Sequence, residues 1–171
     1  MRKLSAHYYL RPDGKFGKRP IIQLDNEGRI INIRETGDAF KEEPGLEYYP
    51  GILIPGFVAS YAETNTEIVK RIKAQAFSNG VLRLKPDHEL LSSAEYIKVW
   101  TALMQDVTPE RTLMNLSHYL ILHTATAAQL LNESEWGVIR VGAKPGLLVL
   151  QNINLKSFSV SVKSTFRVLQ K

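Results

Sequence analysis

Apolar residues cluster in short runs over the first third of the chain, and this pattern predicts strands. The runs are rich in β-branched and aromatic residues and are bounded by Pro, Gly, Asn and Asp. We expect strands at residues 3–10, 20–24, 29–34 and 52–54. Gly28 ends a hairpin turn between the second and third strands, because glycine adopts a positive φ without strain. The last of these strands is expected to stop at residues 55–57, which read Pro-Gly-Phe.

In the middle of the chain the period changes to that of a helix. In residues 64–77, Ile68, Ile72 and Ala76 recur every four positions with Val69 beside them, and Asn79-Gly80 ends the pattern. A second helix is expected after the Ser-Ser-Ala-Glu capping box at residues 92–95. Its apolar face would consist of Tyr96, Val99, Trp100, Leu103 and Val107. Thr108-Pro109 starts a third helix that runs to Ile121, and a short fourth helix would end at Leu131.

The C-terminal part returns to strands, at residues 138–141, 147–152 and 164–169. A chain that begins and ends in strands can place both ends in one sheet, with the helices between them. We therefore predict the α+β class and one compact domain. Its parts are an N-terminal half of a β-sandwich at residues 1–61, a helical segment at 62–134, and the C-terminal half of the sandwich at 135–171.

Composition limits the chemistry that the chain can carry. It has 171 residues, 44% of them hydrophobic, and no cysteine, which excludes disulfides, thiolate metal sites and a cysteine nucleophile. The basic N-terminus lacks an apolar signal core and no run approaches the roughly 20 apolar residues of a membrane span, so we expect a cytoplasmic protein without a membrane partner. The net charge of +5 comes from Lys and Arg scattered singly or in pairs, which is typical of a solvated surface, and we expect no nucleic-acid partner.

The histidines do not suggest a metal site. Of the four, only His118 and His123 are close in sequence, and their spacing places them roughly 140° apart around a helix. Phosphate loops, zinc-protease helices and Cys-x-x-Cys pairs are absent from the sequence. Capping accounts for Ser92 and Ser93, and Lys144-Pro145-Gly146 is expected to be a turn between strands.

Three stretches resemble a known family: "AHYYLRPDGKFGKRPIIQLDNEGRIINI", "LEYYPGILIPGFV" and "WGVIRVGAKPGLLVLQNI". They are similar to the two sequence ends of the amidohydrolase superfamily, in its chlorohydrolase and nucleoside or guanine deaminase branch. The resemblance implies a β-sandwich built from both ends, like the composite domain of metal-dependent hydrolases. In that family the sandwich lies beside a TIM barrel, which needs about 200 to 250 residues, whereas only about 75 lie between the two ends here. The resemblance therefore implies a truncated relative in which a small helical insertion replaces the barrel.

The same resemblance places the family's metal-binding His-x-His pair on Tyr61 and Glu63. A tyrosine phenol, with a pKa near 10, is a poor metal ligand at neutral pH, and the remaining family ligands come from barrel strands. We therefore expect no catalytic residue, no metal and no cofactor. Tyr61 and Glu63 are kept as a candidate pocket, although the carboxylate of Glu63 would also suit the positive end of the helix that follows it.

Two functions remain open. The first is a non-catalytic remnant acting through protein contacts, because a sandwich without its barrel exposes apolar surface that another chain can cover. Its partner would be a second copy or a full-length amidohydrolase relative. The second is a small hydrolase or deaminase-like enzyme, or a small-molecule binder, with a rebuilt site at Tyr61 and Glu63. If the apolar residues of the helices all face the sheet, the domain can be monomeric, whereas outward-facing ones favour a dimer.

Overall fold

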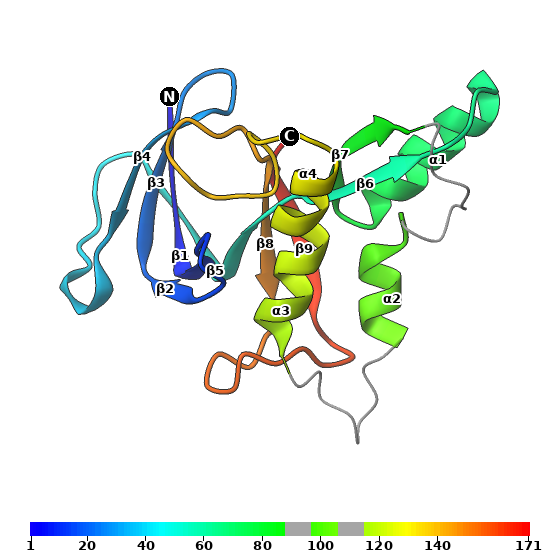
Figure 1. The fold of residues 1–171 in the computed structure, drawn as a ribbon. Coiled ribbons are helices and arrows are strands. Elements are labelled where there is room, and N and C mark those ends of the chain that lie inside the picture. Colours follow the sequence, from blue (N-terminus) through cyan, green and yellow to red (C-terminus); the bar gives the residue numbers. More distant parts are fainter. Residues whose placement is uncertain (88–96, 106–114) are drawn as a thin grey trace.

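Both ends of the chain contribute strands to one seven-stranded sheet (Figure 1). The computed structural model describes residues 1–87, 97–105 and 115–171. The strands follow the spatial order β4-β3-β1-β5-β8-β9, with β2 also paired to β1. They are β1 (Arg2–Leu10), β2 (Phe16–Lys18), β3 (Pro20–Leu24), β4 (Ile30–Glu35), β5 (Leu46–Pro55), β8 (Leu147–Gln151) and β9 (Thr165–Gln170). A 3-10 turn, η1 (Gly37–Ala39), lies between β4 and β5. Because β5 pairs antiparallel with β8, the two sequence ends meet in one sheet, and the α+β prediction is confirmed.

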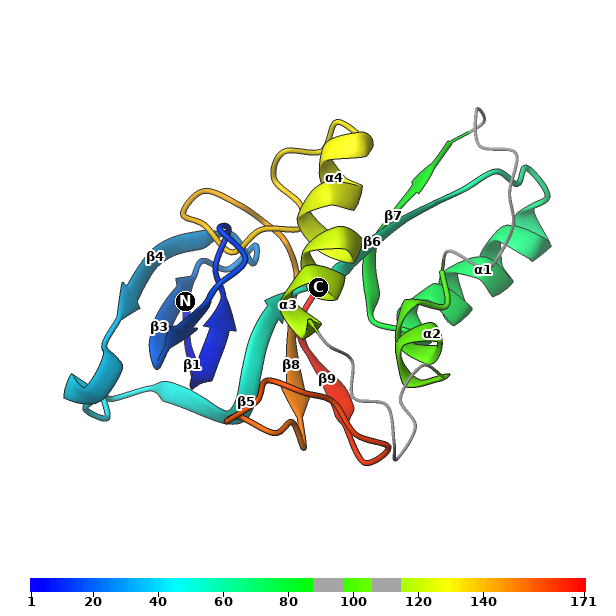
Figure 2. The same ribbon diagram turned by 60° about the horizontal axis from the view of Figure 1, so that its bottom comes forward.

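The sheet curls strongly on itself. Figure 2 shows β1, β3 and β4 on one side of β5, and β8 and β9 on the other. Although β5 and β8 separate β1 from β9, Arg2 Nη1 of β1 donates to the carbonyl oxygen of Leu169 at 2.8 Å. The curled sheet encloses a first core, whose fully buried members are Leu4, Ala6, Ile22, Leu24, Ile30, Leu53 and Val149. This curvature gives the strands their sandwich-like arrangement.

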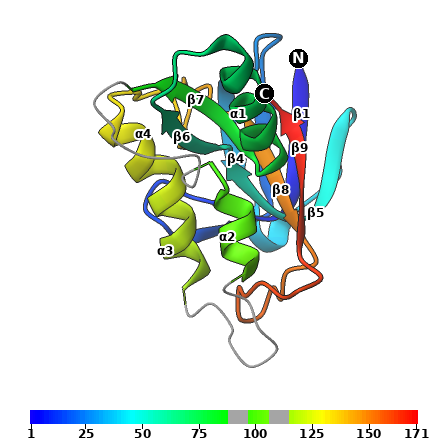
Figure 3. The ribbon, with the colours of Figure 1, turned by 90° about the vertical axis from the view of Figure 1, so that its right-hand side faces the viewer.

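Helices cover the opposite face of the central strands. α2 (Val99–Gln105) and α3 (Leu116–Ile121) lie on the side of the molecule shown in Figure 3. α3 continues through a π-helical turn, η2 (Leu122–Thr126), into α4 (Ala127–Leu130). The helices and the strands together build a second core of Ile52, Ile54, Phe57, Val99, Leu103, Leu116, Leu120, Leu148 and Leu150. No helix in the described ranges has the length and apolar character needed to span a membrane.

The segment after Pro55 differs from the prediction. The strand β5 ends at Pro55 as predicted, but after Gly56 the chain forms a new strand, β6 (Phe57–Tyr61), in a separate two-stranded sheet. The helix α1 (Thr66–Ser78) then leads to an unpredicted strand, β7 (Val81–Pro86), which pairs in parallel with β6. Residues 62–134 are therefore not purely helical. The short apolar run in β7 is interrupted by Arg83 and Lys85, which weakens its signal as a buried strand.

The strand predicted at residues 138–141 is also wrong. Ile139 is buried in the first core, but Val141 is 57% exposed and the segment is a loop. Two backbone hydrogen bonds attach the loop to the start of β4, from Gly142 N to Ile30 O at 2.8 Å and from Ile30 N to Ala143 O at 2.9 Å. An alternation of apolar and polar residues does not distinguish such a packed loop from a strand.

The predicted helices agree where they can be compared. α1 agrees with its expected segment to within two residues at either end, α2 lies inside its expected segment, and the turn at Asn79-Gly80 ends α1. The remaining predictions fall outside the described residues: the capping box at 92–95, Tyr96, Val107, Thr108-Pro109, and also His88.

The ion pair between Arg2 of β1 and Glu47 of β5 predicts a contribution to stability that is lost in acid. Arg2 Nε and Nη2 donate to the two carboxylate oxygens of Glu47 at 2.9 and 2.8 Å, and the Tyr49 hydroxyl donates to Oε2 at 2.7 Å. These hydrogen bonds, of which those from Arg2 have the largest effect, lower the pKa of Glu47 from 4.5 to about 2. A carboxylate whose pKa is lower in the folded than in the unfolded state stabilises the fold at pH values above its unfolded pKa. This contribution of Glu47 is lost as pH falls from about 4.5 towards 2.

Glu47→Gln is therefore expected to lower the free energy of unfolding at pH 7 by about 1 kcal/mol or less, because the pair is more than a third exposed and solvent screens it. Urea midpoints of the variant and wild type should converge as pH falls through that window. Glu42→Gln, at an exposed position, is the control and should show no gap at any pH. A Glu47→Gln gap that stays constant with pH would contradict this assignment.

Candidate functional site

Tyr61 lies at the end of β6, where the chain leaves the small parallel sheet. It pairs with Pro86 of β7, and its carbonyl oxygen accepts from Asp87 N at 2.8 Å. Its side chain is partly buried. The three cavities described below are lined by other residues.

Glu63 uses its carboxylate at the start of α1. Its Oε1 accepts from the backbone N–H groups of Thr64 and Asn65, both at 2.8 Å. Asn65 is the N-cap residue, and its side chain accepts from Glu67 N and Ile68 N at 3.0 and 3.2 Å. Glu63 therefore satisfies backbone donors near the positive end of the helix. Over the described ranges, no three His, Asp or Glu side chains gather closely enough to hold a metal ion.

The apolar stripe of α1 is only partly covered. Ala76 at its C-terminal end is 1% exposed and Ile72 packs against the second core, but Ile68 is 42% exposed. By contrast, Val99 and Leu103 of α2 are buried. The ring of Trp100 packs edge-on against Phe166 of β9, with 5.1 Å between ring centroids. The sequence did not settle whether the apolar residues of the helices face the sheet. Those of α2 do, whereas the N-terminal half of the α1 stripe faces outward.

Strand β7 lies beside this stripe and forms one edge of the small sheet. In the described part of the chain, β7 pairs with β6 alone. Its cationic side chains are already engaged. Arg83 Nη2 donates to the carbonyl oxygen of Lys144 at 2.7 Å, and Lys85 Nζ bonds Glu133 at 2.7 Å. Burial also lowers the pKa of the Arg83 guanidinium.

Two cavities lie near these elements. One of about 240 Å³ between α1 and β7 is lined by Phe77, Leu82 and Leu84, and the Lys171 ammonium lies 4.1 Å from the Phe77 ring centroid. The other, of about 430 Å³, lies between α4 and the loop that follows it and is mostly apolar. Its walls include Ala128, Trp136 and Val138.

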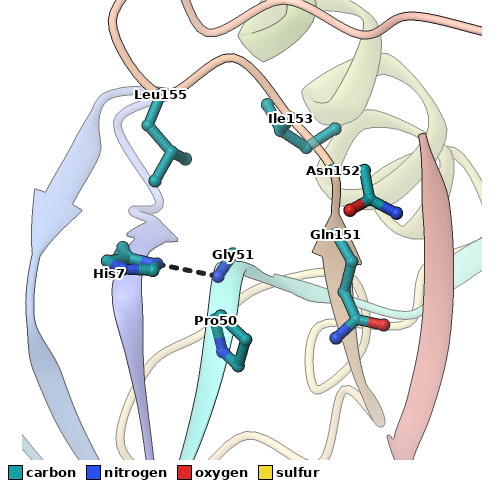
Figure 4. A pocket seen from close by; sticks show the side chains of 7 residues that line it. All are labelled: His7, Pro50, Gly51, Gln151, Asn152, Ile153 and Leu155. Carbon is teal, nitrogen blue, oxygen red and sulfur yellow. Dashed lines mark hydrogen bonds between the residues drawn. The ribbon is translucent and has the colours of Figure 1, made fainter. Parts of the chain in front are cut away.

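A third cavity, of about 250 Å³, lies on the large sheet beside His7 (Figure 4). The pairing of β1 with β5 shifts register between Ala6 and Tyr8, so that Pro50 and Gly51 both lie opposite His7. This is a β-bulge, a local irregularity often found next to functional sites. The last residue of β8, Gln151, and the loop after it supply the other wall, which consists of Gln151, Asn152, Ile153 and Leu155.

The imidazole of His7 is held in one tautomer. Gly51 N donates to His7 Nδ1 at 3.0 Å, so in the neutral ring the proton resides on Nε2. Burial, with a smaller effect from the charge of Arg19, lowers the pKa of His7 and so favours the neutral ring. Its Nε2–H is consequently a hydrogen-bond donor.

Sequence reasoning did not select His7. The available signal was the Pro50-Gly51 pair inside a strand pattern, because a glycine there often marks a bulge. The sequence did not show that residues 151–155 would close the cavity from the far end of the chain. The other two described histidines lie on the helical segment: His118 is exposed, and the His123 ring packs against Tyr119 with 4.4 Å between centroids.

Comparison with known proteins gives one weak structural likeness. No protein-family model and no curated protein matches the chain. Two solved structures of N-acetyl-D-glucosamine-6-phosphate deacetylase from Mycobacterium smegmatis align with it, each with a TM-score of 0.38. One is a mutant in complex with N-acetyl-D-glucosamine-6-phosphate, 13% identical over 61% of this chain and 29% of the deacetylase. The other is 15% identical over 81% of this chain and 45% of the deacetylase.

The chain spans less than half the length of either deacetylase chain. A likeness at this level does not bear on activity, and the similarity to these structures is confined to part of an α+β fold.

Proposed function

We propose that this chain is a shortened, non-catalytic relative of the amidohydrolase superfamily, from its chlorohydrolase and deaminase branch, and that it acts by self-association. The observation that carries the proposal is the outward-facing half of the α1 stripe, where Ile68 is 42% exposed. The second copy is the partner we favour, and a full-length relative is the other candidate. The cytoplasmic location expected from the sequence stays a prediction.

Helix α1 leaves part of its apolar face exposed to solvent. Its apolar residues Ile68, Val69 and Ile72 are exposed or half-buried along one face, and Ala76 alone is buried. Burial of apolar surface contributes about 25 cal/mol per Å², so a second copy of the same stripe laid across it would stabilise a two-fold contact. In such a contact each stripe meets its own copy, as a symmetric dimer requires.

The edge of β7 also favours a contact with another chain at the exposed face of α1. β7 follows α1 directly and, within the described residues, has a hydrogen-bonded neighbour on one side only. A strand edge beside exposed apolar residues favours pairing with another chain. The rebuilt enzyme site at Tyr61 and Glu63 has less support, because the Glu63 carboxylate already accepts two backbone hydrogen bonds.

Sedimentation velocity over a wide range of protein concentration tests the proposal. Wild type is expected to sediment as a dimer and Ile68→Glu as a monomer, because a carboxylate would have to be desolvated in the contact. Ala74→Glu is the matched control: it makes the same charge change at an exposed position on the opposite side of α1 and should stay dimeric. Circular dichroism confirms that both variants fold.

Two outcomes would overturn the proposal. A wild type that is monomeric at the highest concentration rules out self-association. An Ile68→Glu variant that dimerises as tightly as wild type would show that α1 is not the contact.

A further inference from the structure

We propose that the cavity beside His7 binds a small carboxylate with an apolar body. The inference does not depend on self-association, because the cavity lies on the large sheet between β1, β5 and the loop after β8 (Figure 4). It assigns a binding role to residues that the expected site at Tyr61 and Glu63 did not include.

Hydrogen-bond donors line two sides of the cavity. His7 presents a neutral ring in which Nδ1 is already bonded to Gly51 N, so Nε2–H is the group left to donate. Figure 4 shows the amide side chains of Gln151 and Asn152 across the cavity from His7. Each carries an NH₂ group, and neither side chain is bonded elsewhere in the described part of the protein. Three such donors suit the oxygens of a carboxylate, which accepts hydrogen bonds only.

The local charge also favours an anion. None of the 7 lining residues is acidic. Arg19 is the neighbour of His7 on the adjacent strand segment, where Arg19 N donates to His7 O at 2.9 Å. Its guanidinium lies 5.9 Å from the Phe40 ring centroid, and it makes no ion pair with a carboxylate in the described ranges. A positive charge close to a cavity lowers the cost of bringing a negative group into it.

Apolar groups limit the rest of the ligand. Pro50, Ile153 and Leu155 complete the wall, and the Tyr48 ring lies 5.6 Å from the His7 ring, centroid to centroid. A cavity of about 250 Å³ is slightly smaller than the range of roughly 300 to 1,000 Å³ typical of drug-sized ligands. The ligand class that fits is therefore a monocarboxylic acid with one small ring or a short branched chain.

Backbone conformation singles out the same place. Gly51 has φ of +132°, and Asn152 and Arg19 have φ of 56° and 48°. Positive φ values are costly for residues other than glycine, and they concentrate at binding and catalytic sites because the surrounding structure must hold them in place. The Asn152 carbonyl oxygen accepts from Ser164 Oγ at 2.9 Å, which fixes this turn. The bulge, the oriented imidazole, Gly51 and Asn152 line one cavity, and Arg19 is bonded through its backbone to His7.

Nuclear magnetic resonance titration of the full chain tests the inference, with benzoate and isovalerate as probes and benzamide as the neutral comparison. We expect saturable shifts of the Gly51 and Asn152 amide signals and the His7 ring signals with at least one carboxylate, and weaker binding of benzamide. Asn152→Asp should weaken carboxylate binding about tenfold or more, because it places a like charge against the ligand.

Asn154→Asp is the matched control. It changes the charge equally in the same loop, but its side chain bonds Lys156 N and Ser157 N and does not line the cavity. It should bind the carboxylates within about twofold of wild type. Three results would overturn the inference: no saturable shift at these signals with either carboxylate, benzamide binding as tightly as benzoate, or Asn152→Asp binding as tightly as Asn154→Asp.

Discussion

Gly51→Ala is expected to lower the free energy of unfolding by about 3 kcal/mol or more, and the variant is expected to be largely unfolded if the wild type is only marginally stable. Gly51 has φ of +132°, and a Cβ built on it would lie 1.9 Å from the carbonyl oxygen of Leu150. That oxygen belongs to the backbone of β8, whose Leu150 pairs with Ile52 of β5. Relieving the clash requires the backbone of β5 or β8 to shift, and the pairing of these strands joins the two ends of the chain.

Gly45→Ala separates the clash from the effect of positive φ alone. Gly45 has φ of +73°, and nothing lies within 4 Å of a Cβ placed there. This control should cost about 1 to 2 kcal/mol, the strain of a left-handed residue. Urea unfolding followed by circular dichroism measures both variants. Equal small losses would show that the backbone at Gly51 relaxes and that the bulge is not a fixed feature.

The sheet was predictable where apolar runs are long and bounded by turn residues. Residues 20–24 match β3 to the residue, and residues 147–152 differ from β8 by one position. These strands have neighbours on both sides in the curled sheet. Because their side chains are buried, their local sequence is a run of apolar residues. The same reasoning predicted a strand at 138–141 from its apolar residues, of which Ile139 is indeed buried. It failed because that burial comes from a loop packed over the core.

β6 and β7 were missed for a different reason. Gly56 separates β5 from β6, and a Cβ at Gly56 would lie 2.5 Å from Leu82 Cβ. The glycine therefore allows the chain to pass close to β7 where it leaves β5 and begins β6. The residue that Gly56 approaches, Leu82, follows α1 in the sequence, so no local sequence pattern predicts the contact.

The candidate site was the least predictable part. The resemblance to amidohydrolases directed attention to Tyr61 and Glu63, while the cavity proposed here as a binding site lies beside His7. A lone histidine has no sequence signature. Its importance depends on a bulge in β5 and on a loop after β8, and these meet only after the sheet has formed.

Phe57→Ala tests whether β6, α1 and β7 belong to the same cooperative unit as the large sheet. Phe57 is fully buried in the second core, with Ile54 and Leu148 from the sheet. Its backbone N donates to Gly80 O at 3.0 Å, at the turn between α1 and β7. Removing a fully buried phenylalanine ring costs about 3 to 5 kcal/mol, as lost transfer energy plus a cavity.

Phe77→Ala is the matched control, because Phe77 is 40% exposed on α1 and its loss should cost about 1 kcal/mol or less. Unfolding is best followed by circular dichroism and by tryptophan fluorescence, since Trp100 packs against β9 and reports on the second core. If the two signals of Phe57→Ala change together at lower urea, the parallel pair and the sheet unfold as one. A Phe57→Ala variant as stable as Phe77→Ala would mean that the β6–α1–β7 segment is not held against the sheet, and its exposed α1 stripe would then reflect loose packing rather than a contact surface.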